Sequence, residues 1–268
     1  NLEADAERIL RFTASNSLAA NPQKTGFLLI RKHKFTEERA VNIGGTMVKE
    51  KSSHCILGIT VNNTLSWKDH VDGKGGLLNA IHQRLGSLRR ISHSVPQKSM
   101  PCIASAIVAS KVRYGIAIYG QLRMNETDPS NESSRKLQIT LNDAMRISLG
   151  KKRRDRMHIA ELIEETGLKS FNRMVAEDQL RLIWQSVNIE ASPLAHVAKR
   201  KEIDAGGRTS RSGSRGDLQN SARTSLGQRN FPEPAIRLWN NCPQAVREAR
   251  SKYSAKKEIA RFTKSLPL

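Results

Sequence analysis

The stretch Leu57-Gly58-Ile59-Thr60-Val61, the turn pair Asn62-Asn63 and the segment beginning at Trp67 decide the fold that this sequence predicts. Residues 54–61 read as a buried strand, which the turn pair closes. From Trp67 onward the apolar period becomes helical. Its first stripe consists of Leu77, Ile81, Leu85 and Leu88. We therefore expect an α+β fold, with a short partial β layer at the N-terminal end followed by a mainly α-helical bundle.

On the N-terminal side, the pattern predicts a helix and two further β elements. Residues 2–15 place their apolar side chains on one helical face, and residues 25–30 read as a buried strand. Residues 42–48 read as a hairpin in which Gly44 and Gly45 supply the positive φ of the turn. The expected β layer therefore has three or four short strands and one helix.

On the C-terminal side, helical patterns dominate as far as residue 190. Residues 94–97, Ser-Val-Pro-Gln, fit a capping box that would begin a helix. Further helices are expected over 137–149, ended by Gly150, over 158–165 and over 171–187. Glycine, serine, arginine and asparagine then dominate residues 191–230. Four segments result: 1–66 with the β layer, 67–190 with helices, 191–230 as a flexible basic linker, and 231–268 as a basic end segment.

Charge is the second strong signal. The chain carries 45 basic and 25 acidic residues, a net charge of +20. Such an excess is usually neutralised by a polyanion, so nucleic acid is the leading partner class. A membrane surface is the second class, but the sequence has no long amphipathic helix flanked by lysine and arginine that would lie on one. No apolar run reaches the roughly 18 residues that cross a bilayer, so no membrane partner is expected. Three widely spaced cysteines argue against a disulfide framework, so we expect an intracellular protein, nuclear and/or cytoplasmic.

Several short segments occur in an order that is similar to one known family. Asn21-Pro22-Gln23-Lys24-Thr25 leads into an apolar run, and Leu57-Gly58-Ile59 precedes Trp67 and His70. Ser110 to Gly115, Leu141 to Arg146, and Leu238-Trp239-Asn240 follow. Together they resemble the region after the catalytic aspartate loop in reverse transcriptases of non-LTR (LINE-type, jockey-like) retrotransposons. Ala20, Phe12 and Ile56 depart from that pattern.

The resemblance implies the C-terminal part of an RNA-directed DNA polymerase: the end of the palm, a helical thumb and a connector. No two aspartates are adjacent in this sequence, and no Tyr-x-Asp-Asp occurs. The implied role is therefore to bind RNA template and DNA primer beside an upstream palm and fingers region. We expect this chain alone to be inactive and to hold no cofactor. Mg²⁺ is expected only for the intact polymerase.

Two candidate residues come from the resemblance. Lys24 opens the strand after the catalytic loop in the family, where a lysine reaches the phosphates of the incoming nucleotide. Its alternative is an exposed lysine at a strand start. Gly58 lies where the family has its primer-grip hairpin and would let the backbone approach nucleic acid, but a simple bulge is the alternative. For Trp67 and His70 we expect packing and capping.

The sharpest charge run follows the helix expected over 137–149. It is made of Lys151, Lys152, Arg153, Arg154 and Arg156. These cations either bind phosphates or simply complement the helix dipole as a solvated helix end. Tyr114 and Tyr119 are expected in the core. No metal-ligand spacing such as Cys-x-x-Cys occurs, so no metal site is expected.

Two other functions remain open at this point. The chain could be a repurposed, non-catalytic nucleic-acid-binding protein, which salt-sensitive binding by the isolated chain would favour. It could also be a helical scaffold for a protein partner, which weak nucleic-acid binding and a stable protein complex would favour.

Overall fold

The computed structural model describes residues 2–21, 24–31, 39–122, 132–199 and 217–266. They form two compact units, Asn1–Gly73 and Lys74–Leu268. The first holds two small antiparallel sheets and the second is helical, which confirms the expected α+β class. Along the sequence, the first unit ends at Gly73, seven residues after the expected boundary at 66. The reason is that the short helix α2 (Lys68–Asp72) is hydrogen-bonded to a strand of the first unit.

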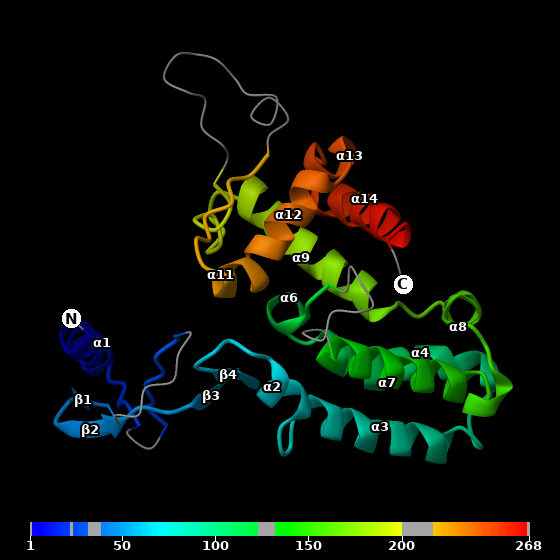
Figure 1. Cartoon of the computed structure of the whole chain (residues 1–268), viewed down its shortest axis with the longest axis horizontal. Helices are drawn as coiled ribbons and strands as arrows, with labels where there is room; N and C mark the ends of the chain where they lie inside the picture. Colours follow the sequence, from blue (N-terminus) through cyan, green and yellow to red (C-terminus); the bar gives the residue numbers. More distant parts are fainter. Residues whose placement is uncertain (1, 22–23, 32–38, 123–131, 200–216, 267–268) are drawn as a thin grey trace. The chain divides into compact units, whose positions relative to one another are not determined.

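Hairpins make up the β layer of the N-terminal unit (Figure 1). The elements are α1 (Leu2–Ser15), β1 (Ala40–Ile43), β2 (Thr46–Lys49), β3 (Ser53–Ile56), β4 (Ile59–Asn62) and α2 (Lys68–Asp72). Strand β1 pairs with β2 so that Val41 faces Val48. Gly44 and Gly45 adopt φ of 58° and 80° in the turn between them, as the sequence predicts.

Two sequence expectations in this unit are wrong. The expected single strand over 54–61 is a second hairpin, because Leu57 and Gly58 both adopt positive φ, 49° and 80°. Two adjacent residues of that kind give the tight turn that suits a hairpin. Residues 25–30 form no strand. Phe27 makes one isolated parallel bridge to Glu50, and Lys51 N–H donates to the Phe27 carbonyl at 2.9 Å.

Side chains around Asn62 fix α2 against β4. Asn62 Nδ2 donates to Asp69 Oδ2 at 2.8 Å, and its Oδ1 accepts from the Ser66 N–H at 2.8 Å. The Thr60 N–H donates to His70 Nδ1 at 3.3 Å. Trp67 and His70 are both buried. This geometry supports the packing interpretation of Trp67 and gives His70 a structural task.

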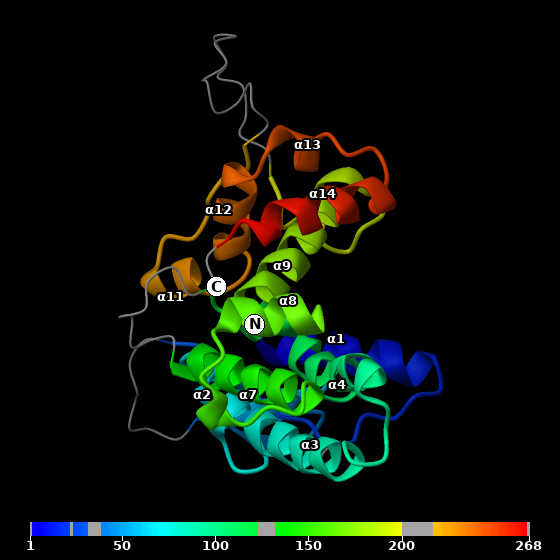
Figure 2. The same ribbon diagram turned by 90° about the vertical axis from the view of Figure 1, so that its right-hand side faces the viewer.

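Helices account for the regular structure described in the C-terminal unit (Figures 1 and 2). Its first part contains α3 (Leu77–Ile91), η1 (Gln97–Ser99), α4 (Met100–Ala104), η2 (Ser105–Ala109), α5 (Ser110–Arg113), α6 (Ile116–Tyr119), α7 (Glu132–Ser148), η4 (Arg153–Asp155) and α8 (Ile159–Thr166). Its second part contains α9 (Phe171–Asn188), α11 (Ser225–Arg229), α12 (Glu233–Asn241), α13 (Gln244–Arg247) and α14 (Lys252–Lys264).

Apolar stripes hold these helices together. The predicted stripe of α3 is buried and packs on α7, whose Leu137, Leu141 and Met145 are also buried. Helix α9 lies against α12 and α14 and carries a second core that includes Trp184 and Trp239. Full burial of each such large apolar side chain contributes about 1.5–3 kcal/mol.

Helix ends follow the sequence only in part. Gly150 adopts a left-handed φ of 66° and closes α7 as predicted, and Gly167, also at 66°, closes α8 in the same way. The expected capping box at 94–97 is wrong: the 3-10 turn η1 begins at Gln97, and Pro96 before it provides no side-chain cap.

The linker expected over 191–230 is packed into the core at both of its described flanks. Ala198 and Leu218 are buried in the second core, and residues 200–216 lie outside the described residues. Asn240 holds Leu218 by accepting from its N–H at 2.8 Å and donating to its carbonyl at 3.0 Å. Leu218, an apolar residue in a polar stretch, is thus buried in the second core.

Candidate nucleic-acid interface

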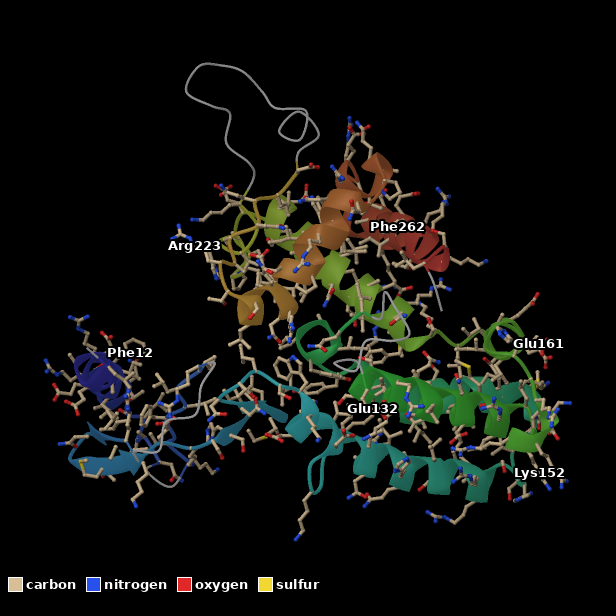
Figure 3. The ribbon with its side chains drawn as sticks, in the orientation of Figure 1. Phe12, Glu132, Lys152, Glu161, Arg223 and Phe262 are labelled. Atoms are coloured by element: carbon tan, nitrogen blue, oxygen red, sulfur yellow. The ribbon has the colours of Figure 1, made fainter. Side chains whose placement is uncertain are left out.

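The end of α7 shapes the predicted charge run, which we call the basic cluster: Lys151, Lys152, Arg153, Arg154 and Arg156. Gly150 N–H donates to the Ile147 carbonyl at 3.1 Å, and Lys151 N–H donates to the Arg146 carbonyl at 2.8 Å. This pair of bonds is a Schellman motif, which ends the helix sharply. The cluster then turns through η4, and each of its side chains is exposed. Lys152 is labelled at this end of α7 in Figure 3.

One member of the basic cluster is committed to the fold. Arg153 donates from Nε to Asp143 Oδ1 at 2.9 Å and from Nη2 to Oδ2 at 2.5 Å. These hydrogen bonds and the charge of Asp143 raise the pKa of Arg153. The other four members make no ion pair with a described acidic residue. Within the described part of the chain, the cluster therefore offers four cations without an acidic partner to a ligand, and one that is neutralised.

The other two candidates lie in the N-terminal unit. Lys24 is exposed and follows a turn in which its N–H donates to the Asn21 carbonyl at 3.1 Å, so it does not open a strand. Gly58 lies in the tip of the β3–β4 hairpin, beside Leu57, whose side chain is 85% exposed. Gly58 is exposed at this tip, so its backbone is accessible.

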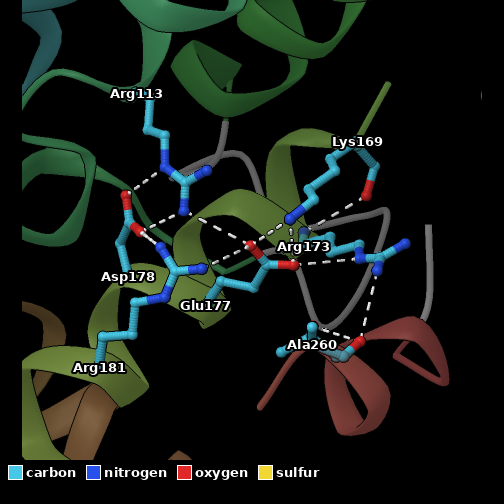
Figure 4. A network of polar contacts seen from close by, with 9 residues as sticks. Arg113, Lys169, Arg173, Glu177, Asp178, Arg181 and Ala260 are labelled. Atoms are coloured by element: carbon cyan, nitrogen blue, oxygen red, sulfur yellow. Dashed lines mark hydrogen bonds and ion pairs between the residues drawn. The ribbon is translucent and has the colours of Figure 1, made fainter. Parts of the chain in front are cut away.

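A charge network that the sequence did not predict lies around α9 (Figure 4). Glu177 is fully buried and accepts from Lys169 Nζ at 2.7 and 2.6 Å and from Arg173 Nε at 3.3 Å. Asp178 accepts from Arg113 Nε at 2.9 Å and from Arg181 Nη1 at 3.2 Å. Four cations thus share two carboxylates.

Electrostatics explain why these groups stay charged. Burial by itself raises the pKa of Glu177, but the hydrogen bond and charge of Lys169, with the charges of Arg113 and Arg181, outweigh it and lower that pKa. The hydrogen bond to Asp178 raises the pKa of Arg113. Only the spacing of Glu177 from Arg173 and Arg181 along one helix could have indicated part of the network from sequence.

The two tyrosines behave differently. Tyr119 is buried as predicted, and its hydroxyl donates to the Val112 carbonyl. The expectation is wrong for Tyr114, whose side chain is 54% exposed with Lys111 Nζ at 6.0 Å from its ring centroid. Helix α5 ends at Arg113, and the left-handed Gly115 follows Tyr114 and begins α6. This turn between two helices places Tyr114 outside the core.

Three further observations concern metal binding, membrane crossing and similarity to known proteins. They contain no group of three His, Cys, Asp or Glu side chains that could hold a metal ion. Across the described ranges, no helix is both long and apolar enough to cross a membrane. Comparisons with known protein families, with curated proteins and with solved structures find no match to this chain.

Proposed function

We propose that this chain is part of a non-LTR retrotransposon reverse transcriptase and that its role is to hold RNA template and DNA primer. The observation that carries the proposal is the basic cluster at the end of α7, on a chain of net charge +20. Four of its cations are exposed and pair with no acidic residue that the structure describes. The order of the sequence motifs supports the family. The helical unit that follows the small sheets suits a thumb.

Binding by such a cluster is electrostatic. Each phosphate that a lysine or arginine neutralises releases counterions, so affinity falls steeply with salt. Phosphate contacts position a protein on nucleic acid without reading the sequence. The proposed binding is therefore salt-sensitive and nearly independent of sequence.

Bond formation is not assigned to this chain. The family needs Mg²⁺ held by carboxylates at the primer end. The described residues provide no donor set that fits this ion. Lys24 and Gly58 are proposed as contacts to nucleotide phosphate and primer backbone, acting only together with a palm that carries those carboxylates.

A second candidate function is protein binding by the N-terminal unit. Along α1 no residue is buried, and Phe12 is 68% exposed (Figure 3). The apolar side of α1 and the β1–β2 hairpin line a cavity of about 550 Å³. Exposed apolar surface of this kind favours a protein contact, and we propose an upstream palm as the partner.

The test of the main proposal is the salt dependence of binding to labelled duplexes, measured by fluorescence anisotropy. Replacing Lys151 and Lys152 with alanine should flatten the slope of log K against log salt by about 1.8 units. The matched control, Lys257→Ala with Lys264→Ala, removes the same charge from exposed positions of α14 and should change the slope by less than about 0.5 units. Equal effects of both pairs, or wild-type binding without salt dependence, would contradict the proposal.

A further inference from the structure

A small pocket between α9 and α14 lies outside the basic cluster. Its volume is about 190 Å³. Trp184, Ala255 and Ile259 are the apolar part of its lining, which we call the apolar floor. The polar part consists of Arg181, Gln185, Lys252 and Lys256. Pockets for drug-sized ligands hold roughly 300–1,000 Å³. This one suits a small polar group with part of its attachment, not a complete cofactor.

The charge around this pocket is strongly positive. Lys252 and Lys256 are four residues apart on α14, so they share one face of that helix. Both are exposed and make no ion pair with a described residue. Glu258 on the same helix is already bonded to Arg261 at 2.9 Å. No acidic side chain lines the pocket, so nothing in its lining neutralises the lysines.

Arg181 adds charge from α9. Its guanidinium lies 3.2 Å from Asp178 and 3.7 Å from Glu177. Figure 4 shows that Arg113, Lys169 and Arg173 bind the same two carboxylates. Four cations therefore face two negative charges, and the network keeps a net positive charge. The pocket therefore joins an arginine that shares its carboxylates to two lysines that pair with no acidic side chain among the described residues.

The position of Lys252 is unfavourable for the fold alone. Helix α14 begins at Lys252, with Ser251 as its cap. The first turn of a helix carries partial positive charge, so Lys252 lowers helix stability there, whereas Lys256 lies just beyond that turn. A bound anion would reverse that effect, because it would interact favourably with both lysines and with the helix end.

We infer that the α9–α14 pocket binds a phosphate group of a nucleic-acid strand. This inference rests on the proposed function and adds a second contact, on α14, to the one made by the basic cluster. Lys252 and Lys256 donate to the phosphate oxygens, Arg181 supplies charge from the opposite wall, and the apolar floor limits competing water. Charge-assisted hydrogen bonds of this kind are the strong ones.

The experiment compares two charge-matched variants of the full chain. Lys252→Ala with Lys256→Ala removes the pocket cations, and Lys257→Ala with Lys264→Ala removes two exposed cations from the same helix. Alanine favours helix at least as well as lysine, so both variants keep α14. On a short single-stranded RNA, the pocket variant should lose about tenfold in affinity and flatten the salt slope by about 0.7 units. The control should lose less than about twofold.

Lysine acetylation, read residue by residue by mass spectrometry, gives an independent result on the wild-type chain. At a strand concentration about ten times Kd, acetylation of Lys252 and Lys256 should slow about tenfold, because only the free protein reacts. Lys257 should be unchanged. Parallel samples contain inorganic phosphate alone or a nucleoside 5′-monophosphate alone. If these small anions slow the acetylation of Lys252 and Lys256 and the RNA strand does not, the proposal that the pocket binds a nucleic-acid phosphate is wrong.

Different results would contradict the phosphate-binding pocket and the nucleic-acid-binding role of the whole chain. If the wild-type chain binds with a steep salt slope, and the pocket and control variants lose affinity equally, the pocket inference is wrong while the basic cluster retains its role. If the wild-type chain binds no strand at any salt concentration, both are wrong.

Discussion

Glu177 offers the most decisive test of how the helical unit is held together. Its carboxylate is fully buried, with Lys169 Nζ at 2.6 Å, Arg173 Nε at 3.3 Å and Arg113 Nη2 at 3.4 Å. Glu177→Gln keeps the size of the side chain and removes the negative charge. Lys169 and Arg173 then lose their carboxylate partner, while Arg113 and Arg181 keep Asp178.

The expected cost follows from those contacts. Removing one partner of a buried ion pair costs about 3–5 kcal/mol. The lower end applies here, because the cations are each 20–32% exposed and water compensates them in part. We therefore expect a loss of about 3 kcal/mol in the free energy of unfolding. For a unit of this length that corresponds to a Tm lower by about 6–12 °C.

The assay is urea unfolding followed by circular dichroism at neutral pH, with a thermal melt as a second measurement. The control is Glu132→Gln on α7, whose ion pair with Arg135 is about half exposed on both sides. Such surface pairs contribute up to about 1 kcal/mol. If Glu177→Gln and the control differ by less than about 1 kcal/mol, the buried network does not stabilise the unit as argued.

Three other predictions concern different parts of the chain. Glu177 has a lowered folded pKa, so its contribution is fully present above the unfolded value of about 4.3 and is lost as pH falls through the folded pKa. The difference between wild type and Glu177→Gln should shrink in that acid range, and a constant difference would contradict the pKa shift. Arg154→Ala should flatten the salt slope on duplexes by about 0.9 units, whereas Arg153→Ala should flatten it less and lower stability, because Asp143 loses its bidentate partner; anisotropy and urea unfolding of both variants would show whether the order is reversed. Phe12→Ser should reduce light scattering by the isolated chain and leave the free energy of unfolding within about 0.5 kcal/mol, since the ring is exposed; a loss above about 1 kcal/mol would place Phe12 in the core instead.

The sequence correctly predicted the features that depend only on residues close to one another along the chain. The α3 stripe ending at Leu88, the glycine turn at Gly44 and the helix end at Gly150 are all confirmed. Each rests on periodicity or on a backbone angle that a single residue type supplies. The exposure of the basic cluster could be predicted for the same reason, because a charge run after a helix end is normally solvated.

Features that depend on distant residues could not be predicted. Residues 25–30 are apolar enough for a strand, but among the described residues Phe27 bridges to Glu50 alone. Arg113 meets Asp178 across 65 positions of sequence, and Arg153 is neutralised by Asp143 in the preceding helix. The α9–α14 pocket combines Arg181 with Lys252 and Lys256, which no local motif connects. These arrangements become visible only when the helices are packed.

The bonds between Leu218 and Asn240 have a practical consequence for handling the protein. Arg247 also binds Asp217 at 2.9 Å, so the chain re-enters the helical core at two successive residues. Ala198, on the other side of residues 200–216, belongs to the same core. A protease cut between these points would therefore leave two fragments that remain associated. The nicked protein should migrate as two bands on a denaturing gel and elute as one particle from a sizing column.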